Sequence, residues 1–235
     1  MRTPAKNVAV LLLAAGLAAC ARTPSPRALG ATVEVAPAPD TQALPSDWKQ
    51  VATNTDLDRI GRIDTAWTEG LTEARARRHS SEIEREGSLL DPAAALPRPA
   101  VPPGTYRCRV IKLGFGTSNR ASNRGRAFQT FNPFTCFVSV EDSLLVFIKA
   151  TGSDLPAGRL WDDGEKRLVF LGATAARPGV PAPAYGTQPA RDRSGVIERV
   201  GDFRWRLVTP WQSKDARIEV MELVPDTPAP PAATQ

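Results

Sequence analysis

The chain has 235 residues, with 30 basic and 25 acidic side chains, one histidine and three cysteines. Its net charge of +5 comes from charges of both signs mixed along the sequence, which argues against nucleic acid as a partner and only weakly favours anionic surfaces. The one histidine is predicted to lie on the surface at a helix end and no cysteine is spare as a ligand, so we expect no metal, no cofactor and no enzymatic activity.

The N-terminus has the three parts of a secretory signal peptide. Arg2 and Lys6 supply positive charge, residues 8–19 form an apolar run, and small residues precede Cys20. The run is too short to cross a bilayer, which takes about 20 residues, so we expect residues 1–19 to be removed. The pattern resembles a lipobox and predicts a diacylglycerol in thioether linkage to Cys20 and an acyl chain on its freed amine, enough for stable anchoring. A plain secretory signal with a chance cysteine is the alternative.

Composition divides the rest of the chain into a tether, one domain and a tail. Ala21, rather than Asp, follows the cysteine, which favours the outer membrane and a domain facing the periplasm. Residues 20–45 are rich in proline and alanine and are predicted to be a flexible tether. Residues 226–235 are predicted to be a disordered tail. A single domain is expected over 46–225, with no further apolar stretch long enough for a transmembrane helix.

The first part of the domain has a helical pattern. Thr55 with Asp58 three residues later is similar to a capping box and predicts a helix start. We expect the helix to end near Arg78 and His79, with a second helical turn or two over 80–90 and a proline-rich linker over 91–103. Apolar residues recur at steps of three and four and form one face, which comprises Leu57, Ile60, Ile63, Trp67, Leu71 and Ala74.

From residue 104 the apolar period changes to two, which predicts strands. Turn residues at 141–143, 162–164 and 201–202 indicate hairpins. The predicted fold class is α+β, mainly β, with the amphipathic helix packed on an antiparallel meander sheet or a small closed barrel. We favour closure because it removes the sheet edges. Strands are expected over 104–110, 134–140, 144–150, 159–161, 167–171, 195–200, 203–208 and 216–224.

Cys108 and Cys136 remain as one pair once Cys20 carries lipid. In an oxidising compartment they are predicted to form a disulfide, which stabilises the fold by about 3.5 kcal/mol in the chain-entropy model. The alternative is two buried free thiols.

Cations on the predicted strands form the candidate binding site. One interpretation is that they make cross-strand ion pairs with Glu198, Glu219 and Glu222, each of which contributes little. The sharper hypothesis is a cationic patch that binds phosphate or carboxylate groups of lipid or cell-wall ligands. The residues of this patch are Arg107, Arg109, Lys112, Arg191, Arg204 and Arg206.

Other polar features have plainer explanations. His79 lies at the predicted helix end, where a cation complements the helix dipole, and we expect a solvated surface role. Residues 162–164 have the spacing of a turn rather than of a calcium loop. The Gly- and Ser-rich stretch 114–125 is not a P-loop, and we interpret it as a plain loop, with ligand binding at a barrel mouth as the alternative. The five tryptophans are expected to be core and rim aromatics.

The strand region also contains distinctive motifs: GTYRCRVIKLG at 104–114, FTC at 134–136, KATGS at 149–153, VFLG at 169–172, YG at 185–186, RD at 191–192, GVIER at 195–199, RWRL at 204–207 and ELVP at 222–225. Together they resemble the family of bacterial envelope proteins catalogued as domain of unknown function 4893, from about residue 48 to residue 225. The resemblance implies a secreted or lipid-anchored protein in which Cys108 and Cys136 belong together. It implies no activity, substrate or catalytic residue.

These observations favour an envelope lipoprotein that is not an enzyme. Its domain is expected to bind a partner protein or an amphipathic or anionic ligand at the membrane surface, where the N-terminal lipid holds it. The alternative is a structural or assembly scaffold of an outer-membrane complex. A hydrolase is a distant third, because the sequence offers no nucleophile–base pair.

Overall fold

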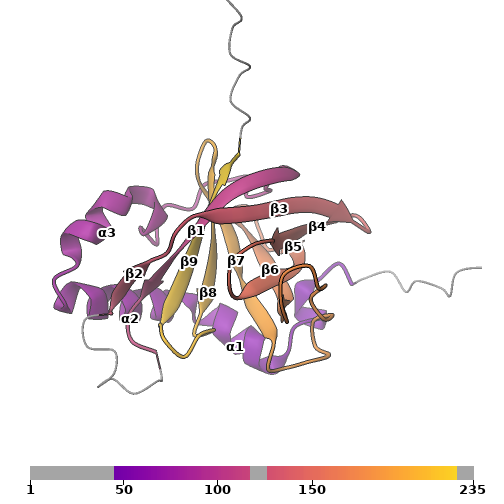
Figure 1. Ribbon diagram of the computed structural model, residues 1–235, viewed down its shortest axis with the longest axis horizontal. Helices are drawn as coiled ribbons and strands as arrows, with labels where there is room; N and C mark the ends of the chain where they lie inside the picture. Colours follow the sequence, from indigo (N-terminus) through magenta and orange to yellow (C-terminus); the bar gives the residue numbers. More distant parts are fainter. Residues whose placement is uncertain (1–44, 117–125, 227–235) are drawn as a thin grey trace, which may run out of the picture. The chain divides into compact units, whose positions relative to one another are not determined.

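Nine antiparallel strands form the centre of the protein in a computed structural model that describes residues 45–116 and 126–226 (Figure 1). The predictions for the signal peptide, Cys20, most of the tether, loop residues 117–125 and the tail after 226 lie outside these residues. The strands are β1 (Gly104–Leu113), β2 (Phe128–Thr130), β3 (Phe134–Glu141), β4 (Leu144–Lys149), β5 (Leu155–Asp162), β6 (Arg167–Ala175), β7 (Asp192–Gly201), β8 (Arg204–Pro210) and β9 (Ile218–Pro225).

Eight of these strands close into a barrel. Each strand of the order β1-β3-β4-β5-β6-β7-β8-β9 pairs with the next, and β9 returns to pair with β1. The closing register runs from Tyr106 opposite Pro225 to Leu113 opposite Ile218. The extra strand, β2, pairs only with the end of β1. The prediction of an antiparallel sheet that closes into a barrel is therefore confirmed.

β1 changes its partner halfway along its length. Residues 104–108 pair with β3, whereas residues 111–113 pair with β2. The connection from β2 to β3 stays beside β1, because the backbone N–H of Phe131 donates to the carbonyl of Val110 at 3.0 Å. The barrel wall therefore has an irregular corner between β1 and β3, and this corner positions the candidate site.

The disulfide between Cys108 and Cys136 ties β1 to β3 just before the two strands part. The two Cα atoms are 6.0 Å apart, and both residues belong to the barrel interior. The predicted disulfide is thus present, and it holds the corner from which the candidate site opens.

The interior of the barrel is filled by apolar side chains. Trp205 faces Tyr106 edge-on at 6.2 Å, and Phe147 meets Phe170 in the same manner at 6.0 Å. The other buried residues of this cluster are Val101, Cys108, Val110, Cys136, Val138, Leu160, Leu168, Ile197, Leu207, Met221 and Leu223. The centre of the barrel is therefore a packed core, and it contains one of the five tryptophans.

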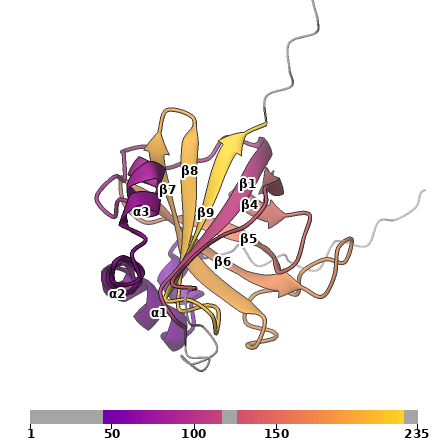
Figure 2. The ribbon, with the colours of Figure 1, turned by 60° about the vertical axis from the view of Figure 1, so that its left-hand side comes forward.

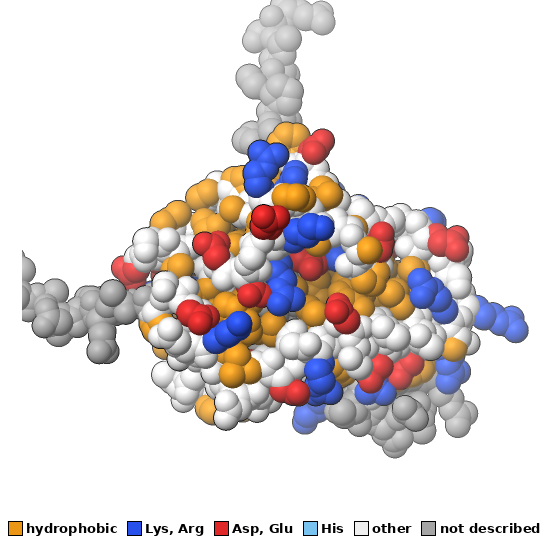
Figure 3. All heavy atoms as spheres, turned by 180° about the vertical axis from the view of Figure 1, so that it is seen from behind, with side chains coloured by type: hydrophobic (Ala, Val, Ile, Leu, Met, Phe, Trp, Pro, Cys, Tyr) orange, Lys and Arg blue, Asp and Glu red, His pale blue; other side chains and the backbone are white. Residues whose placement is uncertain are grey.

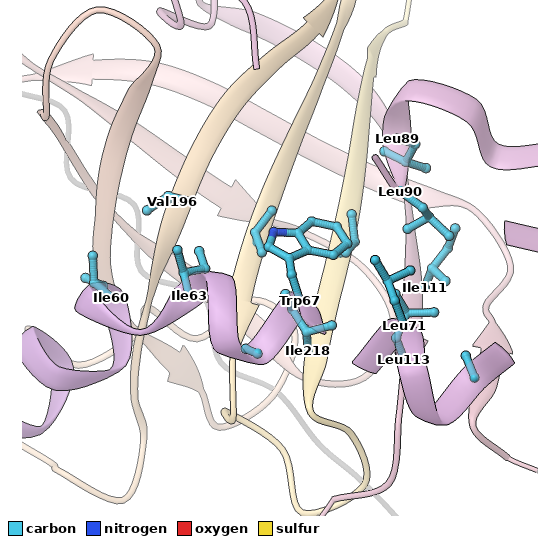
Figure 4. Packing of buried hydrophobic residues seen from close by; sticks show 14 of the residues in the cluster. Ile60, Ile63, Trp67, Leu71, Leu89, Leu90, Ile111, Leu113, Val196 and Ile218 are labelled. Atoms are coloured by element: carbon cyan, nitrogen blue, oxygen red, sulfur yellow. The ribbon is translucent and has the colours of Figure 1, made fainter. Parts of the chain in front are cut away.

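The helices cover part of the outer face of the barrel, beside β1 and β7–β9 (Figure 2). Trp67 and Leu71 point from the helix toward Ile218 and Leu113 of the sheet (Figure 4). Trp161 belongs to this outer cluster rather than to the interior. The helical elements are η1 (Trp48–Gln50), α1 (Asn54–Gly61), α2 (Ile63–Ala76), α3 (Ser80–Glu86) and η2 (Gly87–Leu89).

The structure corrects the predicted helix boundaries. The N-cap is Thr53, whose hydroxyl accepts from the N–H of Asp56 at 3.2 Å, so the cap lies two residues before Thr55. A break at Arg62 divides the predicted single helix into α1 and α2 without interrupting its apolar face. The second helix ends at Ala76, because Arg78 adopts a left-handed conformation with φ of 67°. No helix within 45–116 and 126–226 is long and apolar enough to cross a membrane.

A buried carboxylate fastens α1 to the barrel and to the loop before β7. Asp56 is 2 % exposed and accepts hydrogen bonds from Tyr185 (2.5 Å), Ser194 (2.8 Å), Thr53 (2.9 Å) and Arg59 (2.9 Å). Burial opposes ionisation of Asp56, but these four hydrogen bonds outweigh it and hold its pKa below the usual value. Burial and the bond to Asp56 raise the pKa of Tyr185 to about 12, so the phenol stays a donor.

Candidate functional site

A cavity of about 450 Å³ opens beside the corner where β1 and β3 part. Its volume falls in the range of small-molecule sites, about 300–1,000 Å³. Loops at the strand ends form its rim, and inner faces of β1, β8 and β9 form its floor, so it is the mouth of the barrel. The lining residues are Val110, Lys112, Phe131, Asn132, Pro133, Phe134, Lys149, Thr151, Gly152, Ser153, Asp154, Pro156, Arg193, Leu207, Thr209, Glu219 and Met221.

The floor of this mouth cavity is apolar. Val110, Leu207 and Met221 belong to the interior core and also line the cavity. Phe134 and Pro156 add apolar surface at the side. A ligand that covers this floor removes apolar surface from water, which favours binding by about 25 cal/mol for each Å² buried. The floor therefore favours a molecule with an apolar body.

The first charged pair of the wall is Lys112 with Glu219. Lys112 follows Val110 by two residues on β1 and Glu219 precedes Met221 by two on β9, so both share the inner face, and they lie opposite each other in the register. The Lys112 Nζ and Glu219 Oε1 atoms are 2.8 Å apart, and their side chains are 18 % and 13 % exposed. This pair neutralises itself inside the mouth.

The second pair is Arg193 of β7 with Asp154 of the loop before β5. A guanidinium nitrogen of Arg193 lies 3.3 Å from a carboxylate oxygen of Asp154, and the Thr174 hydroxyl donates to the same oxygen at 3.1 Å. Arg193 also donates to the backbone carbonyl of Asp192 at 3.0 Å. The donors of Arg193 are thus directed to groups of the protein itself.

Lys149, at the end of β4, is the third cation of the mouth. It lies two residues after Phe147 on the inner face, and it is only 9 % exposed. Its ammonium donates to the carbonyl of Ser153 at 2.5 Å and lies 4.2 Å from the centroid of the Phe134 ring. Among the described residues that line the mouth, it is the only cation without a carboxylate at ion-pair distance.

Burial lowers the pKa of Lys149 below its usual value. The more distant carboxylates of Asp154 and Glu219 oppose this shift, and the charge of Lys112 adds to it. The protonated amine is therefore less stable here than in water, and an anion brought against it would restore the charged form. The mouth thus combines an apolar floor with one cation that lacks a counter-ion.

The six cations of the predicted patch are not brought together. Arg109 pairs with Glu86 and Glu222, and Arg204 shares Glu222 at 2.5 Å. Arg107 is exposed, and Arg191 donates to the carbonyl of Thr174 at 3.3 Å. Basic and acidic side chains are also interspersed over the face seen in Figure 3. Cross-strand ion pairs, the first of the two interpretations of these arginines, describe Arg109 and Arg204.

Arg206 is the cation of the predicted patch least able to meet a ligand, because it is completely buried on the outer face. It donates to Glu198 at 2.7 Å and to the carbonyls of Leu89 (3.0 Å) and Asp91 (2.7 Å), and it stacks over Trp67 at 4.9 Å. A guanidinium whose donors are taken by the protein has none left for a ligand. Arg206 therefore fixes the segment after η2 to the barrel. Of the six cations, only Lys112 lines the mouth.

Sequence reasoning missed Lys149, Arg193 and Asp154 as members of one site. Lys149 ends an apolar run, and such a residue resembles the polar end of a strand. The signal that was available is the two-residue period, which places Lys149 on the face of Phe147 and Lys112 on the face of Val110. The pairing of distant strands, which brings these faces together, is not readable from that period.

Among the described residues, the other features that could form a site are a second hollow and the acidic side chains. A hollow of about 790 Å³ lies over the outer face of β4–β6 beneath the loop from 177 to 185, and most of its lining is alanine, glycine, proline and aliphatic side chains. No group of three or more His, Cys, Asp or Glu side chains that could hold a metal ion occurs in residues 45–116 and 126–226. Lys149 also belongs to the lining of the outer hollow, but of these two cavities only the mouth is lined by Val110, Leu207 and Met221.

Comparison with known proteins gives one match. The model of a family described as a domain of unknown function (DUF4893) matches residues 48–223, which include every described helix and strand up to β9. No curated protein and no solved structure is significantly similar to the chain.

Proposed function

Because the chain belongs to the DUF4893 family, whose description assigns no activity, we propose from the mouth cavity that the protein is a binding module for small amphipathic monoanions. The observation that carries the proposal is Lys149, a nearly buried cation without a carboxylate partner above an apolar floor. The wall holds three cations and two carboxylates, so one negative charge balances it.

The carboxylate of a medium-chain fatty acid has this chemistry. Its charged head would meet the Lys149 ammonium, and its chain would cover Val110, Leu207 and Met221. A hydrogen bond to a charged group contributes about 1.5–3 kcal/mol. We therefore expect the mouth to prefer a carboxylate to an alcohol of equal length by about tenfold or more.

The binding test compares octanoate with octanol by isothermal titration calorimetry on the full chain. Octanoate is expected to bind, octanol to bind about tenfold more weakly, and Lys149→Met to abolish the difference. The matched control is Lys166→Met, an exposed lysine in the turn between β5 and β6, which should leave both affinities unchanged. Equal binding of the acid and the alcohol to the unmodified chain would refute the proposal.

We further propose that the lipid on Cys20 holds this module at the periplasmic face of the outer membrane, where amphiphiles are abundant. The proposal rests on the N-terminal sequence pattern. In a bacterium that expresses the chain, Cys20→Ser should move the protein from the membrane fraction to the soluble periplasmic fraction. A Cys20→Ser protein that stays with the membrane would show that something other than this lipid anchors it.

A further inference from the structure

We propose that Lys149 is also a reactive amine that captures aldehydes in the mouth of the barrel as imines. This covalent chemistry goes beyond the binding of anions, because it uses the neutral amine rather than the ammonium. Its ligand class is the aliphatic aldehyde, whose chain the apolar floor would accept.

The geometry leaves the amine held in place but reachable. The carbonyl of Ser153 accepts one N–H of Lys149 at 2.5 Å and fixes the end of the side chain, while the residue still lines an open cavity of about 450 Å³. Phe134 covers one side of the nitrogen at 4.2 Å. An aldehyde lying on Val110 and Met221 would place its carbonyl group in the same cavity as this nitrogen.

The surroundings also favour the unprotonated amine. Removal from water and a neighbouring cation are the two conditions that activate a lysine as a nucleophile, and Lys149 has both, through its burial and through Lys112. Lys112 shares the cavity but lies 2.8 Å from the carboxylate of Glu219, and an ammonium in an ion pair has no lone pair to offer. The two lysines of the mouth therefore have different roles.

The reaction is a condensation that needs no oxidant or reductant. The lone pair of Nζ attacks the carbonyl carbon, the π electrons move to oxygen, and a proton passes from nitrogen to oxygen to give a carbinolamine. Loss of water then leaves a carbon–nitrogen double bond. One amine and one aldehyde are consumed and one water is released, and the same steps in reverse free the aldehyde.

The test traps the imine formed with hexanal. The full chain is incubated with hexanal and sodium cyanoborohydride, which reduces the imine to a stable secondary amine, and the modified residue is located by peptide mass spectrometry. We expect Lys149 to be alkylated several-fold faster than the exposed Lys166, because burial disfavours the ammonium of Lys149 and leaves more of the neutral amine. Alkylation spread evenly over Lys166, the N-terminus and Lys149 would overturn the proposal.

Two variants and one competitor complete the experiment. Lys149→Arg keeps the charge but removes the primary amine, so it should lose the alkylation at this position, whereas Lys166→Arg should not change it. Octanoate should protect Lys149 from hexanal if the mouth also binds anions. If hexanal alkylates Lys149 rapidly and octanoate does not slow the reaction, anion binding is refuted and the reactive amine stands. If Lys149 reacts no faster than Lys166 and octanoate slows the reaction further, the reactive amine is refuted and anion binding stands.

Discussion

A buried cation has a carboxylate partner on the outer wall under the helices but none in the mouth of the barrel. On the outer wall, Arg206 has no exposure, and Glu198 and backbone carbonyls accept its hydrogen bonds. In the mouth, Lys149 is almost as buried but has one carbonyl and an aromatic ring in place of a carboxylate. A buried charge that is fully paired serves the fold, whereas one left without a counter-ion beside a cavity marks a place for a ligand.

The largest expected effect comes from breaking the outer wall at Arg206. Arg206→Met removes the donor from the partly buried carboxylate of Glu198 and from the carbonyls of Leu89 and Asp91. The loss should be about 3–5 kcal/mol of unfolding free energy, measured by urea denaturation. The control is Arg107→Met, because Arg107 is exposed on the same strand as Arg109. Its unfolding free energy should stay within about 0.5 kcal/mol of that of the unmodified protein. A change as small as that of the control would show that Arg206 does not hold the wall together.

The second effect concerns the corner from which the mouth opens. The disulfide closes a loop with a sequence separation of 28, and its loss should cost about 3.5 kcal/mol in the chain-entropy model. Cys108→Ser with Cys136→Ser should therefore lower the melting temperature, and reduction of the unmodified protein should lower it by a similar amount. Unchanged melting after verified reduction would contradict a stabilising role for this bond.

The third effect concerns the fastening of α1. Asp56→Asn removes a charge that accepts four hydrogen bonds, and we expect a loss of about 2 kcal/mol. Since the pKa of Asp56 is lowered in the fold, its contribution is complete above the pKa of the unfolded chain and disappears as the pH falls through the lower folded value. The Asn variant should therefore lose less stability in acid than the unmodified protein. Asp58→Asn, in an exposed pair with Arg62, is the control.

The smallest effect has the opposite sign, because it concerns the cation without a carboxylate partner. Lys149→Met removes a cation that burial disfavours, so the fold should gain about 1 kcal/mol at neutral pH while octanoate binds no better than octanol. The lowered pKa predicts the same sign, because the cost of the charge is complete below the folded pKa of Lys149 and fades as the pH rises from that value to the pKa of the unfolded chain. A destabilised Lys149→Met protein would mean that the lysine serves the fold, as Arg206 does.

Much of the fold could be predicted from the sequence, because it depends on local periodicity. The face containing Ile60, Trp67 and Leu71 and the two-residue alternation after Gly104 both recur in the structure. The cap was placed wrongly because Thr55–Asp58 and Thr53–Asp56 have the same spacing, and only packing distinguishes them. The break at Arg62 was missed because the apolar period continues through it.

The candidate site was less predictable, because it depends on contacts between distant strands. Lys112, Lys149 and Glu219 belong to β1, β4 and β9, and no local pattern indicates that they meet. The sequence predicted a cationic patch from the arginines because they repeat along single strands. The cross-strand interpretation named Glu198 and Glu222, which pair with Arg206, Arg109 and Arg204, whereas Glu86, the second partner of Arg109, comes from α3, whose position only the folded structure supplies.

If an anion completes the environment of Lys149, the titration of that lysine reports it directly. Lysine labelled with carbon-13 at Cε would report the pKa of Lys149 by NMR in the full chain, without and with saturating octanoate. We predict a pKa below the usual lysine range in the free protein and an upward shift when octanoate binds. An ordinary pKa that octanoate does not change would contradict the account.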